Sequence, residues 1–275
     1  MENTIRDEFI KLGQALKLAG VVDDGVQAKY EIQESGQNLS GQMADKMKQN
    51  TDEPQNLYAQ SAVLMDADSG RVLFGKEEHV IRPMASTTKI MTALIVCEQC
   101  NVLDRMRIPK EAVGIEGSSM YLKEGEVLTL QELLYGLMLS SGNDAAVALA
   151  IYCGGTVEGF AELMNDKARN LGLTGTHFEN PNGLDSPGHY STAKDLGTLA
   201  AYAMENPIFY KTVSAKNVKV GDRYLTNHNK LLWRVAGADG VKTGFTKAAG
   251  RILVSSATRD GRRVIVVTID DPSDW

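Results

Sequence analysis

A serine and a lysine stand three positions apart, at Ser86 and Lys89, at the start of an apolar stretch that predicts a helix. Side chains three positions apart lie on one face of a helix. A serine hydroxyl is a weak nucleophile at neutral pH, and an unprotonated amine beside it can accept its proton as it attacks a carbonyl. The pair is therefore a candidate nucleophile and base, although a helix-capping serine beside a surface lysine gives the same pattern.

Two later stretches favour the chemical interpretation. Ser141 and Asn143 lie in a connection between two predicted helices, which presents a hydroxyl and a carboxamide. Lys242, Thr243 and Gly244 lie in a predicted strand and add a cation, a second hydroxyl and a position without a side chain. The order Ser-x-x-Lys, Ser-x-Asn, Lys-Thr-Gly is the signature of active-site-serine penicillin-binding proteins and class A β-lactamases.

Residues 57–275 resemble one branch of these proteins, the serine D-alanyl-D-alanine carboxypeptidases, which are low-molecular-weight penicillin-binding proteins. Asn-Pro-Asn-Gly-Leu at 180–184 and Gly-His-Tyr-Ser-Thr-Ala at 188–193 look like this branch rather than the lactamases. The resemblance implies an α/β protein of the β-lactamase/transpeptidase-like fold, with a mostly antiparallel sheet covered by helices and an inserted all-helical subdomain. It also implies removal of the terminal D-alanine from peptidoglycan stem peptides, and acylation by β-lactam antibiotics.

Acyl transfer gives each motif an expected role. Ser86 would attack the carbonyl of the penultimate D-alanine, and Lys89 would be the general base if burial and a nearby cation lower its pKa. Ser141 would relay a proton to the leaving amine, and Asn143 would hold either Lys89 or the substrate amide. The backbone N–H groups of Ser86 and Phe245 are the expected oxyanion hole.

The third motif is expected to recognise the free carboxylate of the substrate. Lys242 and Thr243 would bind it, with Thr246 close by, and Gly244 would keep the strand edge open to the substrate backbone. Some family members carry an arginine upstream of Lys-Thr-Gly that assists with the carboxylate. This chain reads Asn-His-Asn-Lys there, and His228 fits either a surface or core position or a role in the site.

Two other functions are open on the sequence. A class A β-lactamase activates the deacylating water with the glutamate of a Glu-x-x-Leu-Asn motif; here only Glu162 opens a similar stretch, with the wrong spacing and in mid-helix. A β-lactamase is therefore less favoured than a penicillin target. A non-catalytic β-lactam-sensing or wall-binding domain is the other alternative, because it can keep all three motifs.

No cofactor and no metal are expected, because His79, His177 and His189 lack ligand spacing. Cys97 and Cys100 have C-x-x-C spacing, but they fall in or just after the helix of the first motif, without a second ligand pair. We expect buried or reduced thiols there rather than redox or metal use.

Composition agrees with an acyl-transfer enzyme but says less. The chain has 275 residues, 43% of them hydrophobic, and a formal charge of −6, which fits one large globular domain or two smaller ones. The sequence has no apolar run long enough to predict a membrane span and no signal peptide at its start. The expected extracytoplasmic location, in the cell wall or on the periplasmic side, therefore follows from the family resemblance alone. The expected partners are stem peptides ending in D-Ala-D-Ala and β-lactams, with no nucleic acid.

Residues 1–56 differ from the rest and are expected to form a short helical leader followed by a polar linker. The helix pair resembles the opening of a small RNA-binding domain shared by a ribosomal small-subunit protein, tyrosyl-tRNA synthetase and pseudouridine synthases. The segment holds six Lys and Arg against ten Asp and Glu, which makes it a poor phosphate binder. Its first helix carries an apolar stripe of Phe9, Leu12, Leu16 and Ala19.

The remaining pattern predicts one sheet and one helical part. Residues 101–206 are mostly helical in pattern, with capping boxes at Thr129/Glu132 and Thr192/Asp195. Early and late strands must pair with each other, and the family resemblance implies a site between the sheet and the helical part. The predicted strands cover residues 62–65, 71–74, 218–225, 240–246, 251–257 and 263–269.

The last predicted strand is apolar on both faces, and residues 271–275 look like the cap of a further helix before which this domain is apparently cut. We expect the stripe of the leader to cover one face of that strand, in this chain or in a neighbouring copy. Deleting residues 1–56 should then lower the melting temperature by several degrees and increase binding of a hydrophobic dye, because exposing three large aliphatic side chains forfeits roughly 4 to 9 kcal/mol. A 57–275 fragment that melts unchanged as a dye-silent monomer would contradict this contact.

Overall fold

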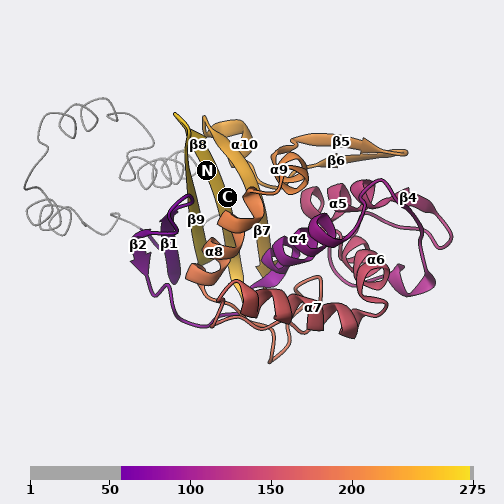
Figure 1. Cartoon of the computed structure of the whole chain (residues 1–275), viewed down its shortest axis with the longest axis horizontal. Helices are drawn as coiled ribbons and strands as arrows, with labels where there is room; N and C mark the ends of the chain where they lie inside the picture. Colours follow the sequence, from indigo (N-terminus) through magenta and orange to yellow (C-terminus); the bar gives the residue numbers. More distant parts are fainter. Residues whose placement is uncertain (1–56, 273–275) are drawn as a thin grey trace, which may run out of the picture.

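The computed structural model describes residues 57–272, so the predicted leader at 1–56 lies outside the described residues. A five-stranded antiparallel sheet in the order β2-β1-β9-β8-β7 forms its centre (Figure 1). The two early strands thus join the three late ones in one sheet through the pairing of β1 with β9, as the sequence predicted. The strands are β1 (Ser61–Asp66), β2 (Val72–Lys76), β7 (Ala238–Thr246), β8 (Gly250–Arg259) and β9 (Arg262–Asp271).

Most of the chain between β2 and β7 builds a helical part, which Figure 1 shows beside the sheet, while α8 lies across the sheet. No single helix within residues 57–272 is long and apolar enough to cross a membrane; only α6 and α7 together, bent by 81°, reach that length and apolarity. The helices are η1 (Ala85–Thr88), α4 (Lys89–Gln99), η2 (Lys110–Ala112), α5 (Leu130–Leu139), α6 (Asn143–Gly154), α7 (Val157–Asn170), α8 (Ala193–Met204), α9 (Pro207–Ser214) and α10 (Leu231–Arg234).

Both faces of the sheet are apolar. On one face α8 packs closely on β1, because Gly197 has no side chain where a Cβ would lie 2.6 Å from the sulfur of Met65. That face joins the main core of the molecule. The opposite face carries a smaller cluster of Leu64, Ala257, Val264 and Val266, against which Leu73, Phe74 and Val235 pack. Strand β9 is therefore buried on both faces, as its sequence predicted, whereas the proposed cover by the leader stays a prediction.

The two predicted capping boxes have different outcomes. At the start of α5 the box is complete, since Thr129 Oγ1 accepts from the Glu132 amide and Glu132 accepts from the Thr129 amide. At the start of α8, Thr192 Oγ1 accepts from the Asp195 amide at 3.0 Å, but the carboxylate of Asp195 binds Gly175 and Thr176 in the preceding loop. The second prediction is therefore correct for the Thr192 cap only, because the carboxylate of Asp195 is engaged by the loop and does not bond back to the amide of Thr192.

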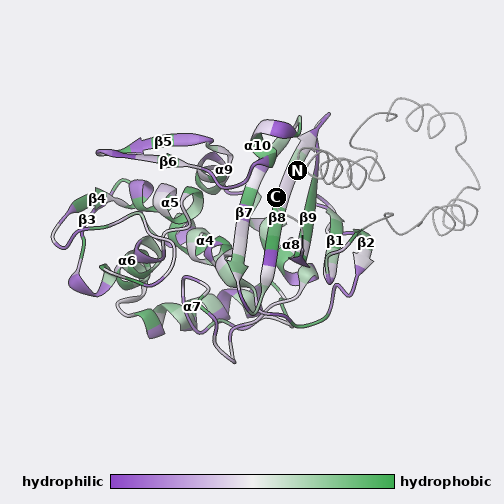
Figure 2. Cartoon of the chain, turned by 180° about the vertical axis from the view of Figure 1, so that it is seen from behind, coloured by the Kyte–Doolittle hydropathy of each residue, from purple (hydrophilic) through white to green (hydrophobic). Residues whose placement is uncertain are grey.

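The predicted strand at 218–225 is wrong. Those residues form a hairpin of β5 (Asn217–Val220) and β6 (Arg223–Thr226), which turns at Gly221 with φ +56°. The hairpin is separate from the main sheet and is largely hydrophilic (Figure 2). A second small sheet pairs β3 (Arg105–Arg107) with β4 (Val127–Thr129).

The cysteines follow the prediction only in part. Cys97 is a free, buried thiol whose pKa is raised to about 12, mainly by burial and then by Glu98. Cys100 instead forms a disulfide with Cys153, which joins the end of α4 to α6. The prediction for Cys100 failed because the helix ends there in an extended conformation, so Cys100 does not continue the buried face that carries Cys97.

Candidate active site

Ser86 lies in the short 3-10 helix η1, directly before α4, which begins at Lys89. The residue before it, Ala85, has a left-handed φ of +45°, an unusual conformation for a residue with a Cβ. Lys89 Nζ lies 3.0 Å from Ser86 Oγ. The two side chains of the first motif therefore meet, as their spacing predicted.

Lys89 is fully buried, and its amine has three oxygen neighbours. Besides Ser86, it contacts Asn143 Oδ1 at 2.6 Å and the backbone carbonyl of Asn182 at 2.5 Å. Burial lowers the pKa of Lys89 well below its usual range, the charge of Lys242 lowers it further, and Asp144 opposes both. The arrangement favours a neutral amine beside a serine hydroxyl.

Lys242 is the second cation of the site and is almost completely buried on β7. Its amine donates to the backbone carbonyl of Thr243 at 2.9 Å, and burial lowers its pKa to about 7. His228 is close enough for the charge of Lys242 to lower its pKa as well, after the larger effect of burial. The structure therefore places His228 near the third motif and leaves its role in recognition a hypothesis.

The second motif precedes and opens α6. Ser141 is buried in a left-handed turn with φ +59°, and Asn143 is the first residue of the helix. Asn143 Nδ2 donates to the carbonyl of Glu116 at 2.6 Å, which turns Oδ1 toward Lys89. Of the two roles considered for Asn143, the structure shows the contact with Lys89.

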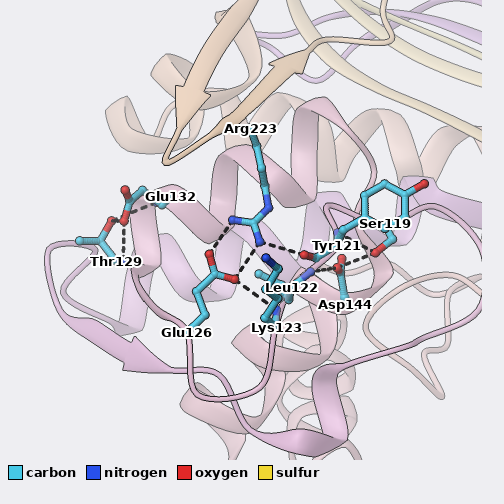
Figure 3. Close-up of polar contacts among 9 residues, drawn as sticks. All are labelled: Ser119, Tyr121, Leu122, Lys123, Glu126, Thr129, Glu132, Asp144 and Arg223. Carbon is cyan, nitrogen blue, oxygen red and sulfur yellow. Dashed lines mark hydrogen bonds and ion pairs between the residues drawn. The ribbon is translucent and has the colours of Figure 1, made fainter.

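A loop from the helical part is tied to this motif through Asp144, a residue that the sequence analysis did not single out. Its carboxylate accepts from Ser119 Oγ and from the amides of Met120 and Leu122 at 2.6 to 3.1 Å. Figure 3 shows the other end of the loop held by Arg223 of β6, which reaches Glu126 at 2.6 and 2.8 Å and the carbonyl of Tyr121. The pairing with Arg223 lowers the pKa of Glu126.

Gly244 lies where a side chain would be crowded by η1, whereas the predicted access of the substrate backbone to this strand edge stays a prediction. A Cβ there would lie 3.2 to 3.3 Å from the amides of Ser86 and Thr87 and from the Ala85 side chain. The edge of β7 therefore lies directly against the turn that holds the serine. Phe245 follows on the same strand with 58% of its surface exposed.

The hydroxyl of Thr246 has two partners within the protein. It donates to Asp185 at 2.9 Å and accepts from the amide of Ala249 at 3.0 Å. The hydroxyl proton is therefore engaged by Asp185 in this structure. A contact of Thr246 with a substrate carboxylate stays a prediction.

The stretch at 178–192, which we name the clasp loop, holds one face of the serine helix. It contacts η1 and α4 at Ala85, Thr88, Lys89 and Thr92, whose spacing places them on one helical face. Gly183 packs on the carbonyl of Ala85 with a left-handed φ of +91°, and the clasp carbonyls of residues 182 and 181 accept from Lys89 and Thr92. His189 meets Thr88 at 2.7 Å.

The contacts of the clasp loop were not predicted, although its motif was noticed. Backbone carbonyls carry two of them, so side-chain identity gives no signal. Within the described residues no group of three or more His, Cys, Asp or Glu side chains is placed to hold a metal ion.

Comparisons with known proteins add two family matches. A family model described as D-alanyl-D-alanine carboxypeptidase matches residues 47–273, and one described as S4 domain matches residues 3–48. The two matches meet inside the segment expected to be a linker. The S4 match covers the leader, whose structure is outside the described residues, and the expectation that the leader binds no nucleic acid stays a prediction.

Two curated relatives illustrate the first match. The chain is 37% identical over 219 residues to D-alanyl-D-alanine carboxypeptidase DacF of Bacillus subtilis, covering 76% of this chain and 56% of DacF. It is 38% identical over 245 residues to DacD of Escherichia coli, covering 84% of this chain and 63% of DacD. The chain therefore spans somewhat more than half the length of these relatives.

Solved structures agree on the fold. Penicillin binding protein 6B from Escherichia coli superposes with a TM-score of 0.76 at 38% identity, covering 80% of this chain and 74% of that one. A serine-to-alanine mutant of Streptomyces K15 DD-transpeptidase gives 0.76 at 36% identity, covering 78% and 92%. The predicted transpeptidase-like fold is confirmed.

Gly183→Ala tests the fit of the clasp loop. The new Cβ would overlap the Ala85 carbonyl in a backbone conformation that disfavours side chains, so we expect the free energy of unfolding to fall by about 2 to 4 kcal/mol. Gly172→Ala is the matched control, because Gly172 has a similar φ of +70° with nothing within 4 Å, and should lose only about 1 kcal/mol. Urea unfolding measures both, and equal losses would show that the close approach does not matter.

Proposed function

Since the chain belongs to the D-alanyl-D-alanine carboxypeptidase family, we propose that it is a serine DD-carboxypeptidase that removes the terminal D-alanine from peptidoglycan stem peptides through an acyl-enzyme on Ser86. The observation that carries this proposal is the buried Lys89 amine 3.0 Å from Ser86 Oγ. The substrate and β-lactams would reach the site on the outer side of the cell membrane, where peptidoglycan lies. The reaction needs no cofactor.

The three contacts of Lys89 support a role as base. A neutral amine has two protons and one lone pair. Asn143 Oδ1 and the Asn182 carbonyl can only accept, so they take the two protons, and the lone pair is left for the hydroxyl proton of Ser86. Lys89 then removes that proton as Ser86 Oγ bonds to the carbonyl carbon of the penultimate D-alanine.

The oxyanion that forms on the substrate carbonyl would be bound by the backbone amides of Ser86 and Phe245. These groups belong to η1 and β7, and the close approach of Gly244 to η1 supports their convergence. Two fixed N–H donors stabilise the developing charge without any reorganisation. Removing one such donor in other enzymes costs a factor of roughly 10² to 10³ in rate.

Collapse of the tetrahedral intermediate breaks the bond to the terminal D-alanine. The leaving nitrogen needs a proton, which Lys89 now holds and which Ser141 would relay. Lys242 and Thr243 would bind the free carboxylate of the same residue, and a carboxylate beside Lys242 favours its charged form over the neutral form that burial favours. Water then hydrolyses the acyl-enzyme and restores Ser86.

Benzylpenicillin should add its own mass to the protein, and Ser86→Ala should abolish the adduct. The β-lactam carbonyl stands in for the peptide carbonyl, but the ring-opened product stays attached and blocks the site. Intact-mass spectrometry measures the adduct, with Ser214→Ala, at the end of α9, as a serine control that should still acylate. Acylation of the Ser86→Ala variant at the unchanged rate would refute the assignment, and a protein that acylates without turning over a D-Ala-D-Ala peptide would be a sensor.

Lys242→Ala should lower carboxypeptidase activity more than acylation by a substrate that lacks the free carboxylate. A lost charge-assisted hydrogen bond costs roughly 1.5 to 3 kcal/mol, or about 10- to 150-fold in kcat/KM. The two rates are compared on a D-Ala-D-Ala peptide and on a thioester without the carboxylate. Equal losses on both would instead place the role of Lys242 on the pKa of Lys89.

A further inference from the structure

One buried titratable side chain in contact with the serine helix has no part in the steps above. His189 lies in the clasp loop, is 3% exposed, and packs edge-on against Phe178 with ring centroids 5.8 Å apart. Its Nε2 lies 2.7 Å from Thr88 Oγ1, and its Nδ1 lies 3.0 Å from the backbone nitrogen of Glu179. Both ring nitrogens are therefore engaged.

The partners of His189 fix its tautomer. A backbone amide can only donate, so Nδ1 accepts from Glu179 and carries no proton. The ring proton of the neutral imidazole is then on Nε2 and is donated to Thr88 Oγ1. The hydroxyl of Thr88 passes its own proton on to the carbonyl of Ala85 at 2.8 Å. In this series of hydrogen bonds, from Glu179 through His189 and Thr88 to Ala85, each donor is paired with an acceptor.

The chain of hydrogen bonds ends on the peptide group that presents the nucleophile. The carbonyl of Ala85 and the amide of Ser86 belong to one planar peptide, so fixing the direction of the C=O fixes the direction of the N–H. That peptide follows Ala85 in its left-handed conformation, which costs of order 1 to 3 kcal/mol and persists only where neighbours enforce it. Gly183 restrains the same carbonyl from the side.

We propose that His189 is a positioning residue for acyl transfer, which acts through Thr88 and the Ala85 carbonyl to aim the Ser86 amide into the oxyanion hole. The inference rests on the proposed function, because it assigns a part in that reaction. It requires the neutral imidazole with its proton on Nε2. A protonated ring would carry a second N–H donor, on Nδ1, facing the N–H of Glu179. The hydrogen bond between Glu179 and His189 would then be lost.

The surroundings of His189 keep it neutral. Burial, and to a smaller extent the charges of His177 and Lys89, lower its pKa to about 4. The charged groups that face it are thus Lys89 from α4 and His177 from the neighbouring bridge, while the side chain of Glu179 lies against Gly188. Since the folded pKa lies below the ordinary 6.5, the positioned state is complete above pH 6.5 and is lost as pH falls toward 4.

Thr88 and His189 variants test this chain. Thr88→Val removes the hydroxyl at nearly constant volume, and we expect the rate of acylation by benzylpenicillin at pH 7 to fall about 10- to 100-fold. Thr88→Ser restores the hydroxyl and should restore the rate. His189→Asn keeps an acceptor for Glu179 but cannot reach Thr88 and should fall similarly, whereas His189→Gln keeps a donor at the ε position and should stay within about threefold of wild type.

Two further readouts separate positioning from a loss of structure. Nitrogen-15 spectra of the histidine rings should show one ring with its proton on Nε2 that titrates near pH 4. The ratio of the wild-type rate to the His189→Gln rate should be constant above pH 6 and fall toward pH 4, because the titration of Lys89 is common to both proteins. The exposed His79 supplies the control His79→Gln, which should leave the pH profile unchanged.

The outcomes distinguish this inference from the proposed function. A wild-type protein that does not acylate at all refutes the proposed function. Normal acylation of wild type together with an unchanged rate for a folded Thr88→Val variant refutes only the role of His189, as does a ring proton on Nδ1. Should His189→Asn fail to fold, the Thr88→Val and Thr88→Ser pair and the ring spectra still decide.

Discussion

Two lysine amines buried in one site are the constraint on which the rest of this structure depends. Both amines are buried, which disfavours their charged forms, and the charge of Lys242 further disfavours that of Lys89. The fold meets this constraint with carbonyl oxygens, from Asn143 and Asn182 for the first amine and from Thr243 for the second. A neutral amine held between fixed acceptors has a defined lone-pair direction. For Lys89 that direction is toward the hydroxyl proton of Ser86, which the reaction must remove.

The three carbonyl groups come from separate parts of the chain, so the surrounding structure acts mainly to hold them in position around the two amines. The sheet contributes the edge of β7, α6 contributes the carboxamide, and the clasp loop contributes a backbone carbonyl. Asp144 and the Arg223–Glu126 pair secure the loop that in turn orients the carboxamide. Apart from the Thr129–Glu132 cap of α5, the polar network of Figure 3 therefore supports Asn143 and, through it, the Lys89 amine.

The sequence predicted the part of the site that depends on side-chain identity. Ser86, Lys89 and Asn143 meet as their motifs indicated, and the paired early and late strands of the sheet followed from their apolar pattern. The carbonyl of Asn182 could not be predicted, because every residue has one. Nor could the disulfide of Cys100, since a partner in another helix is set by tertiary packing. The hairpin β5–β6 was predictable, because Gly221 and Asp222 form a two-residue turn signal between two short strand-like runs, but the prediction joined those runs into one strand.

The order of strands also governs when a reactive serine can exist. Ser61 of β1 pairs with Ile269 of β9, more than two hundred positions later in the chain. Ser86 and Lys89 come early in the chain, yet the strand edge and the clasp loop that complete their surroundings lie at residues 238–246 and 178–192. Pairings this distant are slow to form, because the long segment between the two strands must first be closed into a loop. The sheet topology therefore delays a reactive serine until β7 and β9 have joined the early strands.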